Sequence, residues 1–149
     1  MPRRDLAGTA IVAAVAIVPD LDLLVGDHRG ISHSLGLAVA AGLVAFALTR
    51  RPRWGAAVAL AWASHVALDW MSNDTLPPLG VMALWPLSRD YYKASFEVFP
   101  AVSRKYWLAE FWVYNLKALV VELLIVGPIA AAVVWWRRGP TRVRPPADL

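Results

Sequence analysis

The feature that most constrains this chain is a series of long apolar runs separated by short charged patches. Four runs occur, at about residues 6–25, 31–49, 54–71 and 116–136. A helix that crosses a bilayer needs about 20 mostly apolar residues, because it must satisfy its backbone hydrogen bonds internally across the hydrocarbon core. Hydrophobic residues make up 58% of the chain and charged residues only 17%, against about 45–50% and about 25% in soluble domains. The sequence therefore predicts an all-α integral membrane bundle of about four transmembrane helices.

The first run is the weakest of the four, because only 13 apolar residues, at positions 6–18, precede Pro19. It reaches the length of a span if the apolar residues between positions 21 and 25 continue it into the interface. Two arginines before a short apolar stretch also fit a signal peptide with a small-residue cleavage site near position 16. We favour a first span, because cleavage would leave the two acidic residues that follow near a loose terminus.

Basic residues set the expected orientation of these spans. With four spans, the basic clusters at residues 3–4, 50–53 and 137–144 fall on one side, which carries nine basic and two acidic residues. The other side carries six basic and eight acidic residues. Because cytoplasmic loops are enriched in Lys and Arg, both termini are expected in the cytoplasm. Topology thus explains the net charge of +4, and nucleic acid is not an expected partner.

The stretch at residues 72–115 is not expected to form a fifth span, because prolines interrupt it four times. It is rich in aromatic residues, so we expect an interfacial segment or lid on the outer surface of the membrane. An ordinary aromatic belt is the alternative. Residues 139–149, with three prolines, are expected to form a disordered tail. The rest of the chain, residues 1–138, is expected to be one membrane-embedded domain.

The chemistry of the chain gathers at the outer ends of the first three spans. The chain has no cysteine, so a metal site would use histidine, carboxylate or backbone oxygen ligands. All three histidines lie on the predicted outer side, next to a set of aspartates. The six candidate ligands are Asp20, Asp22, His28, His33, His65 and Asp69. Topology and ligand positions rest on different residues, yet both select the same face of the membrane.

Local spacing supports a shared site. His65 and Asp69 are four residues apart, so both project from one face of a helix. Asp20 and Asp22 point to the same side if their segment is extended. The six side chains offer enough nitrogen and oxygen ligands for one divalent metal ion with supporting carboxylates, or for two ions. The alternative is an ion-paired structure without a metal, in which Asp69 pairs with Arg29 and His65 bonds a backbone carbonyl.

Two further polar residues carry local expectations. Ser32 is a plausible cap for the second span, which would put His33 in the first helical turn. Glu122 lies within the fourth run, where it either reaches the site or pairs with Lys117 and extends its carboxylate to the surface. We favour the structural role for Glu122.

The segments that carry the candidate ligands resemble a known family. They are Pro-Asp-Leu-Asp at residues 19–22, His-Arg-Gly-Ile-Ser-His-Ser at residues 28–34 and Ser-His-Val-Ala-Leu-Asp at residues 64–69, with Trp-Pro at residues 85–86. Together they resemble the signature of the YdjM-like family of metal-dependent hydrolases of the bacterial inner membrane, which includes LexA-regulated members. The resemblance covers roughly residues 10–90, and the histidine segment is its most specific part.

The resemblance implies a divalent-metal site, hydrolytic activity and an inner-membrane location. It also implies that the six candidate side chains are the metal ligands. Members of the family usually carry a further N-terminal segment with an early histidine, whereas the first histidine here is His28. Either the start of the protein lies further upstream or this member lacks one ligand.

These observations predict a membrane-bound, metal-dependent hydrolase. Imidazoles and carboxylates would hold Zn²⁺ or a similar ion, which lowers the pKa of a bound water to about 7. Asp20 or Asp22 would act as general base, and Arg29 would hold an anionic group such as a phosphate. The expected partners are the lipid bilayer and a small-molecule or lipid substrate, with a phosphoester or lipid-linked ester as the substrate class.

The alternative function is that of a non-enzymatic membrane protein, either a metal sensor or transporter or an ion-paired structural protein. A transporter should carry polar groups along a path through the bilayer. The inner halves of the second and third runs contain mostly Ala, Val, Leu and Gly. That composition argues against a transport path and for a one-sided site.

Overall fold

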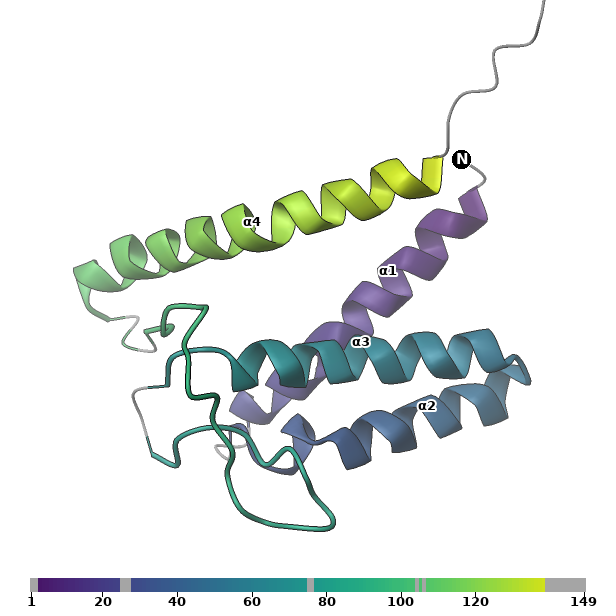
Figure 1. The fold of residues 1–149 in the computed structure, drawn as a ribbon, viewed down its shortest axis with the longest axis horizontal. Coiled ribbons are helices and arrows are strands. Elements are labelled where there is room, and N and C mark those ends of the chain that lie inside the picture. The colour runs from purple at the N-terminus through teal and green to yellow at the C-terminus, as the bar shows by residue number, and fades with distance from the viewer. Residues whose placement is uncertain (1–2, 25–27, 75–76, 104, 106, 139–149) are drawn as a thin grey trace, which may run out of the picture. The chain divides into compact units, whose positions relative to one another are not determined.

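The computed structural model of the chain is all-helical (Figure 1). It describes residues 3–24, 28–74, 77–103, 105 and 107–138. The elements in chain order are α1 (Arg3–Ile17), the 3-10 helices η1 (Val18–Leu24) and η2 (Ile31–His33), α2 (Leu35–Thr49), α3 (Pro52–Trp70) and α4 (Ala109–Arg138). Within the described residues, β structure amounts to two isolated bridges, Ser72 with Phe99 and Val81 with Tyr92. The prediction of an all-α protein is confirmed.

The chain divides into two compact units, residues 1–101 and residues 102–149. The first unit contains α1 to α3 and the irregular segment that follows them, and the second contains α4. The expectation of one membrane-embedded domain over residues 1–138 stays a prediction. The expected disordered tail at residues 139–149 lies outside the described residues.

Helices α2 and α3 form a tight antiparallel hairpin (Figure 1). The turn begins at Arg50, whose left-handed backbone (φ 56°) ends α2, and its N–H donates to the carbonyl of Phe46. Pro52 then opens α3, where a missing N–H costs no helical hydrogen bond. The two backbones approach closely at Gly42 and Gly55, because a Cβ on either glycine would lie within 2.9 Å of the other's carbonyl oxygen.

Helix α1 packs against α3 and ends where proline interrupts its hydrogen bonds. Gly8 leaves room for the indole of Trp54, which a Cβ would approach to 3.3 Å. The α-helix stops at Ile17, because Pro19 cannot donate the next helical hydrogen bond. The chain continues as η1, so the first predicted span is an α-helix followed by a 3-10 turn.

Two helical segments of the described chain have the length and apolar composition to cross a membrane. They are Leu6–Leu24, with 19 residues, and Ala109–Trp136, with 28 residues. Helix α2 is apolar but has only 15 residues. Membrane-length helices are therefore present, and the full four-span arrangement stays a prediction.

Two helix boundaries differ from the predicted ones. Helix α2 begins at Leu35 instead of residue 31, because Ser34 is its cap and accepts a hydrogen bond from the N–H of Leu37 (3.2 Å). The prediction that Ser32 caps this helix is therefore wrong. Helix α4 begins at Ala109 instead of residue 116, and hydrogen bonds between Ser103 and the Asn115 side chain brace its first turns.

An irregular segment folds back onto the loop that precedes α2. We call residues 80–86 the strap. The N–H of Met82 donates to the carbonyl of Arg29 (3.1 Å), and the N–H of Leu35 donates to the carbonyl of Ala83 (3.0 Å). Gly36 admits the closest approach, since a Cβ there would lie 2.2 Å from the carbonyl oxygen of Trp85. The strap thus holds the loop with the first two histidines in place, and the expected interfacial role of residues 72–115 stays a prediction.

Candidate metal centre

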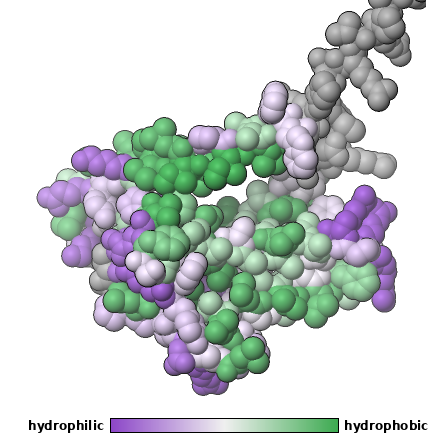
Figure 2. Space-filling model, in the orientation of Figure 1, coloured by the Kyte–Doolittle hydropathy of each residue, from purple (hydrophilic) through white to green (hydrophobic). Residues whose placement is uncertain are grey.

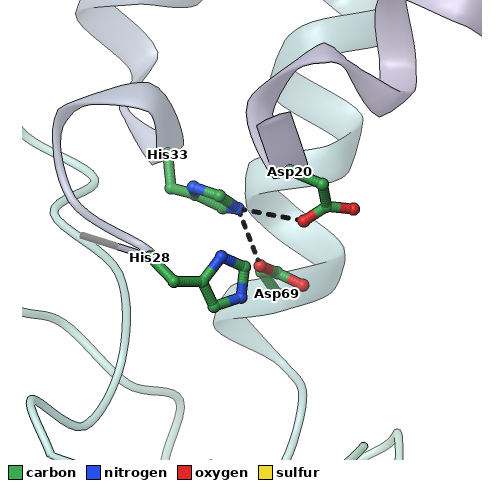
Figure 3. Close-up of side chains that lie close together, drawn as sticks. All are labelled: Asp20, His28, His33 and Asp69. Carbon is green, nitrogen blue, oxygen red and sulfur yellow. Dashed lines mark ion pairs between the residues drawn. The ribbon is translucent and has the colours of Figure 1, made fainter. Parts of the chain in front are cut away.

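The six predicted ligands meet at the end of the α2–α3 hairpin that lies opposite the Arg50 turn. Asp20 and Asp22 come from η1, His28 and His33 from the loop before α2, and His65 and Asp69 from the last turns of α3. Figure 3 shows four of these side chains converging from three elements. Residues far apart in the sequence therefore form one cluster, as the sequence predicts.

Four side chains place one ligand atom each around a common point: Asp20, His33, His65 and Asp69. His33 Nε2 lies 3.6 Å from Asp20 Oδ1 and 3.1 Å from Asp69 Oδ2 (Figure 3). His65 Nε2 lies 3.2 Å from His33 Nε2, 3.4 Å from Asp20 Oδ1 and 3.8 Å from Asp69 Oδ2. A tetrahedral zinc site with bonds of about 2.0–2.2 Å has ligand atoms about 3.3–3.6 Å apart. These five separations, 3.1–3.8 Å, are therefore within about 0.2 Å of the edges of a tetrahedral metal site.

His28 lies beside this group and adds another donor. Single ligand atoms of Asp20, His28, His33 and Asp69 all lie within 4.8 Å of one another. The His28 ring stands edge-on to the His33 ring, with centroids 5.0 Å apart (Figure 3). The cluster can thus hold a metal ion with either four or five protein ligands.

Asp22 contacts the Nδ1 atoms of two histidine rings. Its Oδ1 lies 2.8 Å from His28 Nδ1, and its Oδ2 lies 3.0 Å from His33 Nδ1. Its carboxylate also accepts hydrogen bonds from the Ser32 hydroxyl and from the N–H of Arg29. A carboxylate at Nδ1 orients an imidazole and leaves Nε2 for a metal. Asp22 is therefore placed to position ligands, whereas the sequence predicts it as a ligand.

The expectation that Asp20 and Asp22 point the same way is wrong, because η1 is a 3-10 helix and not an extended strand. A 3-10 helix has about three residues per turn, so side chains two apart diverge by about 120°. Asp20 consequently faces the Nε2 atoms, and Asp22 faces the Nδ1 atoms.

Arg29 joins the cluster to a carboxylate that the sequence analysis missed. Its Nε lies 3.5 Å from Asp69 Oδ2, so the ion pair expected between these residues is present. Its Nη1 lies 2.9 Å from Asp74 Oδ2, and its Nη2 donates to the Ser72 hydroxyl (2.7 Å). The Arg29 side chain is only 11% exposed. The guanidinium is thus ion-paired with two of this protein's own carboxylates, although only its Nη2 donates a hydrogen bond of good geometry. Its expected hold on an anionic substrate stays a prediction.

Asp74 was missed because only the tertiary fold reveals its role. It follows α3 by four residues in a segment with no helical or strand period. Its carboxylate accepts a hydrogen bond from the N–H of Gly80 (3.2 Å), at the start of the strap. The only feature of the sequence that could have indicated this role is the position of Asp74 shortly after α3, the helix that carries His65 and Asp69.

The electrostatics of the cluster favour a cation. His33 is fully buried, and its Nε2 lies within ion-pair distance of the carboxylates of Asp20 and Asp69. Even with His33 protonated, the four carboxylates outnumber the charged groups of Arg29 and His33 by two. Asp69 Oδ2 is buried and accepts no hydrogen bond of good geometry within the described residues. A buried, unsatisfied carboxylate oxygen beside two imidazole nitrogens suits a divalent metal.

Fold and site together define an all-helical protein with membrane-length apolar helices and a His/Asp cluster that could hold a metal ion. More particularly, the chain belongs to the family described as YdjM inner membrane protein, whose model matches residues 2–140. The match confirms the resemblance to YdjM-like proteins and supports a location in the inner membrane. Comparison with curated proteins and with solved structures gave no match.

Proposed function

We propose that the protein is a metal-dependent hydrolase of the inner membrane. A divalent ion, zinc in the first instance, is held by Asp20, His33, His65 and Asp69, with His28 as a further donor. The observation that carries the proposal is the set of five separations of 3.1–3.8 Å among the ligand atoms of the four residues. All donors are nitrogen or oxygen, the set that catalytic zinc sites use.

Two aspartates of the cluster have separate roles in this proposal, as proton acceptor and as the group that orients the histidine rings. A bound divalent metal supplies Lewis acidity and makes water a nucleophile near neutral pH. Asp20 is the most exposed carboxylate of the cluster, at 38%. Where water takes the fourth ligand position, His33, His65 and Asp69 would hold the metal and Asp20 would accept the proton from that water. Asp22 has both oxygens engaged, so it holds the His28 and His33 rings instead of acting as the base.

We further propose four spans with both termini in the cytoplasm and the site at the extracytoplasmic side. The support comes from the α2–α3 hairpin, which has exposed Arg50, Arg51 and Arg53 at one end and the cluster at the other. Basic residues mark the cytoplasmic end of a span. The substrate is a phosphoester or another ester, either soluble or linked to a lipid.

One observation favours a second function, that of an ion-paired structural protein. Asp69 already faces Arg29 at 3.5 Å and His33 at 3.1 Å, so the cluster partly neutralises itself. The same ligand set would also serve a metal sensor or transporter. Metal binding separates the structural reading from the others, and turnover separates the hydrolase from the sensor or transporter.

The test is metal analysis of protein purified through an affinity tag that contains no histidine. We expect about one divalent ion per chain in the wild type and a loss of at least tenfold in the His33→Ala/His65→Ala double variant. Asp69→Asn should also lose metal, whereas Asp90→Asn, at an exposed aspartate bonded to Ser88, should not. Equal metal content in the double variant and the wild type would contradict the metal site.

Turnover is then measured on generic phosphodiesters and carboxylic esters. We expect hydrolysis by the metal-loaded wild type and at least a hundredfold loss in Asp20→Asn. Bound metal without turnover on any ester class would favour a sensor or transporter.

A further inference from the structure

The depth of the cluster follows from the length of the helices that carry it. Along α3, His65 lies 12 residues and Asp69 16 residues from Arg53. At about 1.5 Å per residue these are distances of about 18 Å and about 24 Å. Ser34, at the other end of α2, lies about 24 Å from Arg50 by the same measure. Any tilt of the hairpin shortens these distances along the membrane normal.

The hydrocarbon core of a bilayer is about 30 Å thick. The exposed arginines of the hairpin turn belong at its cytoplasmic boundary, and Figure 2 shows a hydrophilic surface at this end of the hairpin. The cluster then lies about 6–12 Å short of the outer boundary. Asp20 and Asp22 lie four and two residues before the end of Leu6–Leu24, a segment that is apolar enough to cross a membrane.

The side chains that flank the ligands are exposed and apolar. Leu24 is 83% exposed and Leu21 56% exposed, both on η1 beside the aspartates. Leu68, next to Asp69 on α3, is 40% exposed. Exposed leucines on the two elements that carry these carboxylates are less favourable in water than in hydrocarbon. We call Leu21, Leu24 and Leu68 the rim of the cluster. Its apolar side chains suit contact with lipid chains.

We propose that the metal cluster is recessed below the outer surface of the bilayer and takes a lipid-resident substrate. The substrate class is an ester or phosphoester joined to a long apolar chain, which reaches the site sideways from the bilayer. The polar ester would meet the cluster, and the apolar chain would lie against Leu21, Leu24 and Leu68. This inference rests on the proposed hydrolase and on the four-span arrangement.

The depth is tested with single-cysteine variants, which the cysteine-free chain permits without other changes. Leu24→Cys and Leu68→Cys report on the rim, Leu43→Cys in the middle of α2 is the membrane control, and Ser95→Cys is the aqueous control. Each variant is labelled with a fluorophore and reconstituted into phosphatidylcholine vesicles. Iodide on both sides of the membrane quenches labels in water, and nitroxide-bearing lipids quench labels in the bilayer.

We expect the labels at Leu24 and Leu68 to behave like the label at Leu43. Nitroxides on the upper acyl chain should quench them at least threefold more strongly than iodide does, and Ser95 should show the reverse. Iodide quenching of the rim labels equal to that at Ser95 would overturn the proposal. Protection of the rim labels from both quenchers would also overturn it, because protein and not lipid would then cover the rim.

The substrate class is tested on metal-loaded wild-type protein in vesicles. One phosphodiester and one carboxylic ester are each offered with a short chain and with a long, bilayer-resident chain. We expect kcat/KM to be at least tenfold higher for the long-chain member of the hydrolysed pair, and equal values would overturn the proposed substrate. A recessed cluster that binds no metal would overturn the proposed function and its substrate, while leaving the measured depth in place.

Discussion

At the scale of single residues, the centre depends on which atom of each side chain faces inward. Asp22 contacts the Nδ1 atoms of two histidines, and Asp20 and Asp69 face the Nε2 side. Carboxylates of these two kinds have different consequences for a metal, because one supplies a bond to the ion and the other only orients a ligand. All three residues are aspartates, so residue type alone does not distinguish a metal ligand from a group that orients one.

Asp22→Asn should therefore weaken metal binding without abolishing it. We expect a loss of affinity of about 10–100-fold, the usual effect of removing a group that orients a metal ligand. Competition with a chelator of known affinity measures the change, and Asp90→Asn is the matched control. If Asp22→Asn lost metal as completely as Asp69→Asn, Asp22 would be a direct ligand, as predicted from the sequence.

Arg29 should stabilise the fold through the two carboxylates that it joins. Replacing it with methionine leaves Asp69 and Asp74 without their cation, and breaking a buried ion pair costs about 3–5 kcal/mol. The free energy of unfolding in mixed micelles measures this cost. Asp74→Asn should recover part of the loss in the double variant, because one uncompensated charge is removed. Additive losses would show that Arg29 and Asp74 act independently.

At the scale of helices, the site depends on how closely α2 and α3 pack. Gly42 and Gly55 bring the two backbones together on the Arg50 side of the hairpin, and this contact sets the spacing of α2 and α3. The strap holds the other end of α2, with the carbonyl of Trp85 against Gly36. Both contacts need backbone proximity that any side chain would prevent.

Gly42→Ala should destabilise the hairpin by about 1–3 kcal/mol, the cost of forcing a methyl group into a packed contact. The new Cβ would lie 2.8 Å from the Gly55 carbonyl and 2.7 Å from the Ala59 Cβ. Gly127→Ala is the matched control, because nothing lies within 4 Å of a Cβ at Gly127. Alanine there should stabilise α4 by about 1 kcal/mol or less through helix propensity. Thermal unfolding of both variants checks the pair, and equal shifts would argue against close packing at Gly42.

At the scale of the whole molecule, charge distribution sets the expected arrangement in the membrane. The exposed arginines at one end of the α2–α3 hairpin and the carboxylate-rich cluster at the other give this unit an electrostatic direction. Arginine-rich loops are retained in the cytoplasm during insertion. The cluster and the membrane orientation are therefore linked through one hairpin.

Reporter fusions should reveal this orientation. A fluorescent protein, which is active only in the cytoplasm, should be fluorescent when fused at the C-terminus. Alkaline phosphatase, which is active only outside the cytoplasm, should be active when inserted after Ser95. Exchanging the two reporters should abolish both signals. An extracytoplasmic C-terminus would contradict an even number of spans with cytoplasmic ends.

The sequence by itself determined the helical class, the apolar segments and the neighbourhood in which the ligands would meet. These properties follow from local composition and from the helical period, as with His65 and Asp69 on one face of α3. Asp20 and Asp22 show the limit of such reasoning, because their directions depend on whether the chain after Pro19 is extended or coiled.

Only the tertiary structure decided which side chains face the common point. The roles of Asp22, Arg29 and Asp74 arise where η1, the loop before α2 and the segment after α3 meet. No pattern within one segment records the direction of a side chain in another, because that direction follows from packing among elements. The sequence thus set which residues were available to the site, and the packing of three helices and the strap assigned each one its place.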